Sequence, residues 1–240
     1  MNIYQNILSS KKANKKLLAV LIDPEKIDLK SIAAFFEKVH QSITTHIFVG
    51  GSTDEKNQTE TVVSAIKKVT KLPVVLFPGD VRQITNKADG ILFLSLISGR
   101  NPEYLIEQQI EAVPVLQKTD LEIISTGYIL IDGGKETATQ KVSSTKPISQ
   151  SNLDLILNTA LAGEFSGQKF IYLEAGSGAM LPVSENIIQK ISDNLTIPLI
   201  VGGGIRCKQQ LEKAYNAGAD IVVIGTAFEN DESFFGDLKK

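Results

Sequence analysis

The chain has 240 residues, of which 42% are hydrophobic and 22% are charged, and its formal net charge is −2. These values are typical of a soluble globular protein with a large core, and the near-neutral charge, with no tryptophan, excludes the basic and base-stacking surfaces that bind nucleic acid. The single cysteine, Cys207, excludes an internal disulfide and fits a reducing cytosol.

Short apolar runs alternate with segments of helical periodicity along the whole chain. In chain order, strands are predicted at Leu17–Ile22, His46–Val49, Pro73–Phe77, Gly90–Leu96, Glu122–Leu130, Lys169–Leu173, Ile197–Val201 and Ile221–Ile224. Helices are predicted at Leu29–Gln41, Asp54–Val69, Pro102–Val115, Leu153–Ala162, Ser184–Asn194, Lys208–Asn216 and Glu229–Leu238. Apolar strands that alternate with helices form a parallel sheet covered on both faces. Eight such units predict an α/β fold, a (β/α)8 TIM barrel that occupies residues 1–240 as a single domain.

Two parts of the chain depart from this regular pattern. Only twelve residues, 78–89, separate the third and fourth predicted strands, which is too few for a full crossover helix. The third barrel helix is therefore predicted to be shortened or replaced. Residues 132–151 are rich in Gly, Ser, Thr and Lys and follow the fifth strand, so they are predicted to form a mobile active-site loop over the catalytic mouth.

Histidine chemistry is excluded by the positions of the two histidines. His40 and His46 lie at the entrance to the second predicted strand, at the end of a barrel opposite the active site. Neither a histidine-based zinc site nor a histidine-dependent triad can be built from them. Acid–base and metal-binding roles therefore fall to carboxylates, hydroxyls, tyrosines or lysines.

The C-terminal quarter carries the clearest functional signal. Ile197–Arg206 and Ala219–Thr226 each contain a short apolar, β-branched run that ends in glycine. Glycine lets the backbone approach a ligand and direct N–H groups at an anion, and the loops after strands 7 and 8 of a barrel commonly hold phosphate. One glycine pair alone is most often a turn, but Gly176-Ser-Gly178 adds a third such loop after strand 6. We therefore expect a phosphorylated small molecule as ligand.

Asp23 directly follows the first predicted strand and is a candidate metal ligand. Together with Ser52, which follows the second strand, it resembles an oxygen-ligand site for Mg²⁺, which takes few protein oxygens and completes its shell with phosphates and water. The alternative is that Asp23, which precedes a proline, is a turn former or a cap. Lys26 either contacts the same anion or is solvated, and Glu25 is expected to be solvated.

Glu174 lies in Tyr172-Leu-Glu-Ala-Gly-Ser-Gly178, at the end of a strand that is otherwise expected to be buried. A carboxylate there is unfavourable unless it is paired or hydrogen-bonded. Its place beside the phosphate loops suits a group that accepts a proton from a substrate hydroxyl. The alternative is an ordinary salt bridge.

The motifs at five barrel corners, taken together, resemble those of the geranylgeranylglyceryl phosphate synthase family, whose bacterial relatives include heptaprenylglyceryl phosphate synthases. The motifs are Leu21-Ile-Asp-Pro-Glu-Lys26, Val49-Gly-Gly-Ser-Thr53, Tyr172-Leu-Glu-Ala-Gly-Ser-Gly178, Val201-Gly-Gly-Gly-Ile-Arg206 and Ile224-Gly-Thr226. They occur in the family's order over nearly the whole chain. The C-terminal glycines alone would not distinguish this family from other phosphate-binding barrels.

The resemblance implies a Mg²⁺-dependent prenyltransferase that joins a polyprenyl diphosphate, geranylgeranyl diphosphate being the expected one, to the 3-hydroxyl of sn-glycerol 1-phosphate. An ether-lipid precursor would form and diphosphate would be released. By the same resemblance, Asp23 and Ser52 are the expected Mg²⁺ ligands and Glu174 the group that takes the proton. The expected glycerol-phosphate contacts are Tyr172, Leu173, Glu174, Ala175, Gly176, Ser177, Gly178, Gly203, Gly204, Gly225 and Thr226.

A prenyl chain also needs an apolar groove. Candidates along strands 3 to 5 are Phe77, Phe93, Leu96, Ile97, Tyr104 and Leu105, each of which could instead be ordinary core.

Two rival functions remain open at this point. One is another phosphate-binding barrel enzyme, such as a sugar-phosphate isomerase, an epimerase or an indole-type synthase, which would have no need of Asp23 or of a long apolar groove. The other is a non-catalytic barrel that binds a phosphorylated ligand or lipid as a sensor or scaffold, in which Glu174 could become glutamine without loss of function.

The chain contains no apolar stretch near the roughly 20 residues that span a bilayer. Lysines precede Leu17–Ile22 as in a signal peptide, but that run has six residues and ends at Asp23-Pro24 without a cleavage site. We expect a cytoplasmic protein that meets lipid only transiently, through a groove or a surface face, and that associates as a homo-oligomer.

Overall fold

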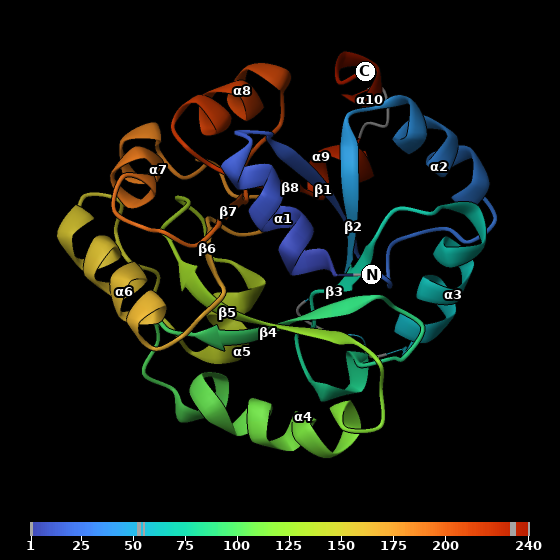
Figure 1. The fold of residues 1–240 in the computed structure, drawn as a ribbon, viewed down its shortest axis with the longest axis horizontal. Coiled ribbons are helices and arrows are strands. Elements are labelled where there is room, and N and C mark those ends of the chain that lie inside the picture. The colour runs from blue at the N-terminus through green and yellow to red at the C-terminus, as the bar shows by residue number, and fades with distance from the viewer. Residues whose placement is uncertain (1, 52–53, 55, 231–233, 240) are drawn as a thin grey trace.

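The computed structural model describes residues 2–51, 54, 56–230 and 234–239, and eight parallel strands in it form a closed barrel (Figure 1). The strands are β1 (Leu17–Ile22), β2 (Thr44–Val49), β3 (Val74–Leu76), β4 (Gly90–Leu96), β5 (Glu122–Leu130), β6 (Phe170–Glu174), β7 (Leu199–Gly202) and β8 (Ile221–Ile224). They are hydrogen-bonded in chain order, and β8 pairs with β1. The predicted (β/α)8 barrel is confirmed.

Helices surround the barrel and lie between most successive strands (Figure 1). The α-helices of the described residues are α1 (Ile3–Lys12), α2 (Ile32–Gln41), α3 (Thr59–Val69), α4 (Gln108–Leu116), α5 (Ala138–Ser143), α6 (Leu153–Phe165), α7 (Glu185–Ser192), α8 (Lys208–Asn216), α9 (Thr226–Asn230) and α10 (Phe234–Asp237). A 3-10 turn, η1 (Val81–Gln83), and a π-helical segment, η2 (Glu103–Glu107), complete the set.

The third crossover is reduced to η1, as the short spacing predicted. Strand β3 has three residues, and its register with β4 covers two pairs, Val75 with Gly90 and Leu76 with Ile91. The edge of β4 beyond Ile91 is therefore not covered by β3. This leaves room in the barrel wall between β3 and β4.

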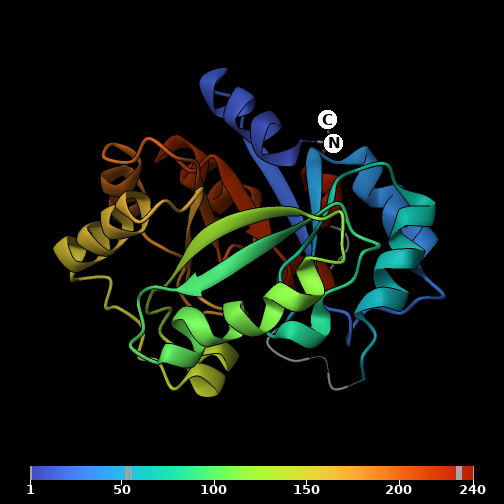
Figure 2. The ribbon, with the colours of Figure 1, turned by 60° about the horizontal axis from the view of Figure 1, so that its bottom comes forward.

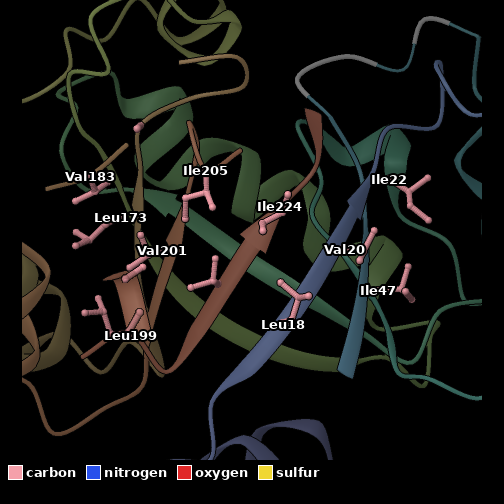
Figure 3. Packing of buried hydrophobic residues seen from close by; sticks show 14 of the residues in the cluster. Leu18, Val20, Ile22, Ile47, Leu173, Val183, Leu199, Val201, Ile205 and Ile224 are labelled. Carbon is pink, nitrogen blue, oxygen red and sulfur yellow. The ribbon is translucent and has the colours of Figure 1, made fainter. Parts of the chain in front are cut away.

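Alternation along the strands divides the core into two layers. In β1, Leu18, Val20 and Ile22 face the helices, and Leu17 and Ala19 face the barrel interior. Figure 3 shows the outer layer, where the three residues of β1 lie near Ile47 of β2. The inner layer contains mostly large side chains, which fill the barrel up to its carboxyl end.

Helix α1, which was not predicted, lies across the amino end of the barrel (Figures 1 and 2). Ile3 and Ile7 are buried on the inner core layer, and Asn2 caps the helix through Gln5 N–H. The Glu122 carboxylate accepts hydrogen bonds from the N–H groups of Ile3 and Tyr4, where the positive end of the helix dipole favours an anion. The opposite end of the barrel stays open for a ligand.

Residues 132–151, which were predicted to form a mobile active-site loop, contain a short helix, α5. The α5 helix begins at a Thr137 cap, and Thr137, Ser143 and Thr145 are buried. Ile148 pairs with Ile131 in a parallel bridge, which ties the segment to the end of β5. Contacts that the polar composition of this segment does not predict therefore pack it onto the barrel.

Candidate active site

A cavity of about 430 Å³ occupies the carboxyl end of the barrel. It is lined by residues that end or follow strands β1 to β8, and by side chains from η1, η2, α4 and α5. Asp23, Glu174, Gly203 and Thr226 all line this same cavity. Groups that the sequence places far apart are thus brought together in one space.

Asp23 follows β1 and lies in a tight turn. Its Oδ1 accepts a hydrogen bond from Glu25 N–H at 3.0 Å, and its Oδ2 lies 3.0 Å from the Lys26 ammonium. A Cβ on Gly51 would lie 3.4 Å from the Asp23 carboxyl atoms, so glycine leaves space beside them. The other predicted metal ligand, Ser52, lies outside the described residues.

Gln83 holds the two loops around this part of the cavity. Its side chain is buried, and its amide donates to Gly51 O at 3.2 Å and accepts from Gly79 N–H at 2.7 Å. A single side chain from η1 therefore joins the loop after β2 to the loop after β3. Sequence analysis missed Gln83, because nothing in the local pattern marks a glutamine as buried.

Glu174 is the last residue of β6 and is 6% exposed. Its Oε1 accepts a hydrogen bond from Gly176 N–H at 2.7 Å. Burial raises the pKa of Glu174 to about 7, and the Gly176 hydrogen bond and the neighbouring Tyr172 hydroxyl limit that rise. A carboxyl group with a pKa near neutrality can exchange protons with a ligand at physiological pH.

Three aromatic rings form the floor of the cavity beside Glu174. Phe77 stacks on Tyr172 with ring centroids 5.3 Å apart, and Tyr128 meets Tyr172 edge-on at the same distance. Burial, and next the Glu174 charge, raise the pKa of both tyrosines well above the usual value, so both hydroxyls stay protonated. The Tyr172 hydroxyl is buried and makes no hydrogen bond of ordinary geometry to any described residue.

The glycine-rich loops after β6, β7 and β8 meet at the acceptor end of the cavity. Gly176, Gly203 and Gly204 all have positive φ, where glycine is favoured. A Cβ on Gly203 would lie 2.5 Å from Glu174 Oε1 and 2.5 Å from Gly176 N. The loops are joined by a 3.0 Å hydrogen bond between the Ser177 and Thr226 hydroxyls. They form a backbone-lined hollow of the kind that binds anions.

Arg206 ties two of these loops together. Its guanidinium donates to Gly178 O at 3.3 Å and to Ala179 O at 2.7 Å, so the β7–α8 loop is fixed to the β6–α7 loop. Its charge also contributes to the cavity, which it lines.

Most of the expected glycerol-phosphate contacts line the cavity, and two do not. Tyr172, Glu174, Gly176, Ser177, Gly178, Gly203, Gly204, Gly225 and Thr226 are lining residues. The side chains of Leu173 and Ala175 belong to the core layer between barrel and helices. Alternation along β6 explains the split, because Tyr172 and Glu174 face inward and their neighbours face outward.

Only some of the residues expected to form an apolar groove line the cavity. Phe77, Phe93, Leu96 and Tyr104 line the cavity, next to Ile84 and Ala112 at the gap between η1 and α4. Ile97 packs in the outer core layer, and Leu105 is not among the lining residues of the described chain. Ala138, Thr139 and Val142 of α5 line the cavity too; they lie in the segment predicted as an active-site loop, but they were not predicted individually.

The chain is similar to one family of known proteins over almost its full length. The family model described as PcrB family matches residues 11–239. The geranylgeranylglyceryl phosphate synthase of Zunongwangia profunda is 62% identical over 96% of this chain and 98% of its own length. That of Flavobacterium johnsoniae is 58% identical over 97% of this chain and 96% of its own length.

Solved structures give the same result. The (S)-3-O-geranylgeranylglyceryl phosphate synthase of Thermoplasma acidophilum, solved in complex with its substrate sn-glycerol-1-phosphate, superposes with a TM-score of 0.92 at 34% identity and covers 99% of this chain and 96% of its own. A thiamine phosphate pyrophosphorylase from Pyrococcus furiosus reaches a TM-score of 0.57 at 16% identity, over 94% of this chain and 93% of its own, which shows a common fold alone.

Proposed function

The chain belongs to the PcrB family, and from this membership and the cavity we propose that it is a geranylgeranylglyceryl phosphate synthase. In the proposed reaction the 3-hydroxyl oxygen of sn-glycerol 1-phosphate attacks the first carbon of a polyprenyl diphosphate, geranylgeranyl diphosphate being the expected donor. An ether bond forms, the carbon–oxygen bond to diphosphate breaks, and the hydroxyl proton passes to the enzyme.

The acceptor end of the cavity supports this assignment most strongly. The buried Glu174 carboxylate, with a pKa of about 7, lies against the glycine loops that suit a phosphate group. A glycerol phosphate whose phosphate occupied these loops would be short enough to bring a hydroxyl to Glu174. The carboxylate would then accept the proton as the ether bond forms. This juxtaposition is the observation on which the proposal depends.

The donor end of the cavity suits an allylic chain. Its lining is mostly apolar toward the gap between η1 and α4, where Ile84, Phe93 and Ala112 lie. Phe77, Tyr128 and Tyr172 present aromatic rings near Glu174, and aromatic faces attract positive charge. They would stabilise the cationic character that builds on the prenyl carbon as diphosphate departs.

We propose Mg²⁺ as the cofactor, with Asp23 and Ser52 as its protein ligands. Asp23 offers a hard oxygen donor inside the cavity, and Gly51 leaves open space beside it. Within the described part of the chain there is no cluster of three His, Cys, Asp or Glu side chains, which fits a metal that completes its shell with diphosphate oxygens and water. When bound, Mg²⁺ would neutralise charge on the departing diphosphate.

The setting of the enzyme is part of the proposal. Among the described residues no helix is long and apolar enough to cross a membrane. Met180 and Leu181 are 66% and 59% exposed in the β6–α7 loop, at the carboxyl end of the barrel, which supports a transient contact with a lipid surface. We propose a cytoplasmic homo-oligomer, which sedimentation and fractionation would test.

The reaction itself is tested by incubating the protein with sn-glycerol 1-phosphate, Mg²⁺ and prenyl diphosphates of increasing length. Mass spectrometry is expected to detect a prenyl ether of glycerol phosphate, and the donor used fastest identifies the chain length. Absence of an ether product with every donor, while glycerol phosphate still binds, would favour the non-catalytic alternative.

A further inference from the structure

The ion pair between Asp23 and Lys26 lines the cavity, just after the end of β1. The Asp23 carbonyl accepts hydrogen bonds from the N–H groups of Lys26 and Ile27, so the turn itself places Lys26 over the carboxylate. Asp23 Oδ2 and Lys26 Nζ are 3.0 Å apart, and the Lys26 side chain is 52% exposed. Such a partly solvated pair is weak and its partners can exchange.

The charged residues that line the cavity are mostly acidic, so an anionic substrate needs the Lys26 ammonium group there. Among the described lining residues, Asp23, Glu25, Asp80 and Glu174 are acids, and only Lys26 and Arg206 are cations. Both proposed substrates are anions, and diphosphate carries the larger charge. Arg206 is held by the carbonyls of Gly178 and Ala179 at the acceptor end. Lys26 is the other cation among these lining residues, and it is three residues from the proposed metal ligand.

We propose that Lys26 is the residue that binds the diphosphate group of the prenyl donor and of the released product. This inference rests on the proposed function. In the free enzyme the Lys26 ammonium pairs with Asp23. When the Asp23 carboxylate is engaged by Mg²⁺, the ammonium turns to the diphosphate oxygens, which offer more negative charge and more acceptors than one carboxylate.

This exchange of partners also explains how Asp23 and Lys26 can pair in the free enzyme and then bind Mg²⁺ and diphosphate, respectively. An unpaired Asp23 would repel diphosphate, and an unpaired Lys26 would repel Mg²⁺. With both present, each charge is balanced before and after the substrates bind. Lys26 therefore opposes metal binding slightly in the free enzyme and supports diphosphate binding in the loaded one.

Lys26 is expected to weaken Mg²⁺ binding and to strengthen diphosphate binding. Lys26→Met tests both effects, because it keeps the length of the side chain and removes its charge. Calorimetric titration with inorganic diphosphate in the presence of Mg²⁺ is expected to show about tenfold weaker binding than for the unmodified protein. Titration with Mg²⁺ alone is expected to show binding about two- to fivefold tighter, because the competing ammonium is gone. Binding of sn-glycerol 1-phosphate is expected to change less than diphosphate binding, because its single phosphate carries less charge than diphosphate.

Two further variants separate Lys26 from general effects of charge and folding. Lys30→Met removes the same charge from an exposed residue of the same connection that does not line the cavity, and it is expected to leave both titrations unchanged. Lys26→Arg is expected to restore most of the diphosphate affinity. Circular dichroism spectra and thermal unfolding would confirm that all variants are folded.

The inference is overturned if Lys26→Met binds diphosphate as tightly as the unmodified protein, or if Lys30→Met weakens it equally. Either result in a protein that still forms the prenyl ether would leave the proposed function intact. If the unmodified protein bound neither diphosphate with Mg²⁺ nor sn-glycerol 1-phosphate, the proposed function would fail as well.

Discussion

The carboxylate of Glu174 fills the space that a side chain on Gly203 would need. Glu174 Oε1 lies 2.5 Å from the Cβ position of Gly203, and the backbone N of Gly176 lies at the same distance from that position. The proton acceptor and the phosphate loops are therefore one packed unit, in which the absence of a side chain at residue 203 lets the carboxylate stay in the cavity.

Gly203→Ala is expected to weaken sn-glycerol 1-phosphate binding by at least tenfold. The new methyl group would displace the Glu174 carboxylate and the Gly176 amide, and alanine is strained at the φ of +84° found here. Calorimetric titration with glycerol phosphate measures the effect. Gly167→Ala is the matched control, since Gly167 has a φ of +86° with nothing within 4 Å of its Cβ position. If the control lost binding to the same degree, backbone strain and not the contact with Glu174 would be responsible.

The pH dependence of turnover is expected to follow Glu174. Its pKa is about 7, and only the ionised carboxylate can accept the hydroxyl proton, so kcat/KM is expected to rise with pH and to level off above about pH 8. The midpoint should lie near pH 7 when glycerol phosphate is varied. A profile flat between pH 5.5 and 8.5, with chemistry rate-limiting, would show that this carboxyl group is not the base.

The same burial makes Glu174 a source of instability at higher pH. Its folded-state pKa is raised, so the folded protein keeps a proton that the unfolded chain has lost between pH 4.5 and 7, and stability falls with rising pH over that range. Glu174→Gln removes this effect and is expected to raise the free energy of unfolding by about 1–3 kcal/mol at pH 8. At pH 4.5 the gain should be much smaller. Urea unfolding at both pH values measures the difference, and an equal gain at both would contradict a pKa effect.

Gln83→Met is expected to loosen the donor end of the cavity. Methionine has a similar volume but leaves Gly79 N–H and Gly51 C=O without the hydrogen bonds that Gln83 makes. A loss of about 2 kcal/mol in unfolding free energy is expected from denaturant titration. Because Gly51 lies against Asp23, Mg²⁺-dependent diphosphate binding should weaken too. The exposed Gln117→Met is a control that should change neither. A Gln83→Met protein as stable as the unmodified one would show that water replaces both bonds.

Much of the fold could be predicted from sequence because a barrel repeats one pattern. Eight apolar runs were long enough to mark every strand, and the twelve residues between Phe77 and Gly90 were too few for a helix, as η1 shows. The predicted helix at Asp54 begins instead at Thr59, because the buried Asp54 carboxylate accepts from the N–H groups of Gln58 and Thr59 ahead of the first turn. The residue at which such a helix begins depends on side-chain contacts that hydrophobic periodicity does not predict.

Helices α1 and α5 were missed for a different reason. Both are short, and each is held by tertiary contacts: Ile3 and Ile7 on the barrel interior, and Thr137 and Ser143 on the loops beside them. α1 has two buried apolar residues and α5 has six residues in all, so the hydrophobic pattern of each gives little signal. The Asn2 cap and the spacing of Ile3 and Ile7 were the one available clue to α1.

The site was predictable where strand ends fixed it. Asp23, Glu174 and the glycines after β7 and β8 line one cavity because the carboxyl ends of all strands in a barrel meet there. The motif did not show that Leu173 and Ala175 lie outside the cavity, because a motif does not say on which face of a strand a side chain lies. Gln83 and the lining residues of α5 come from connections with no repeating pattern.

The most direct test of the account is the turnover of Glu174→Gln in prenyl transfer. Glutamine keeps the size of the side chain and cannot accept the proton, so the rate of ether formation is expected to fall by about 10²–10⁴-fold. Binding of sn-glycerol 1-phosphate, measured on the same sample, is expected to change by no more than about threefold. A variant that bound glycerol phosphate and formed the ether at the unmodified rate would contradict the assignment of Glu174 as the base.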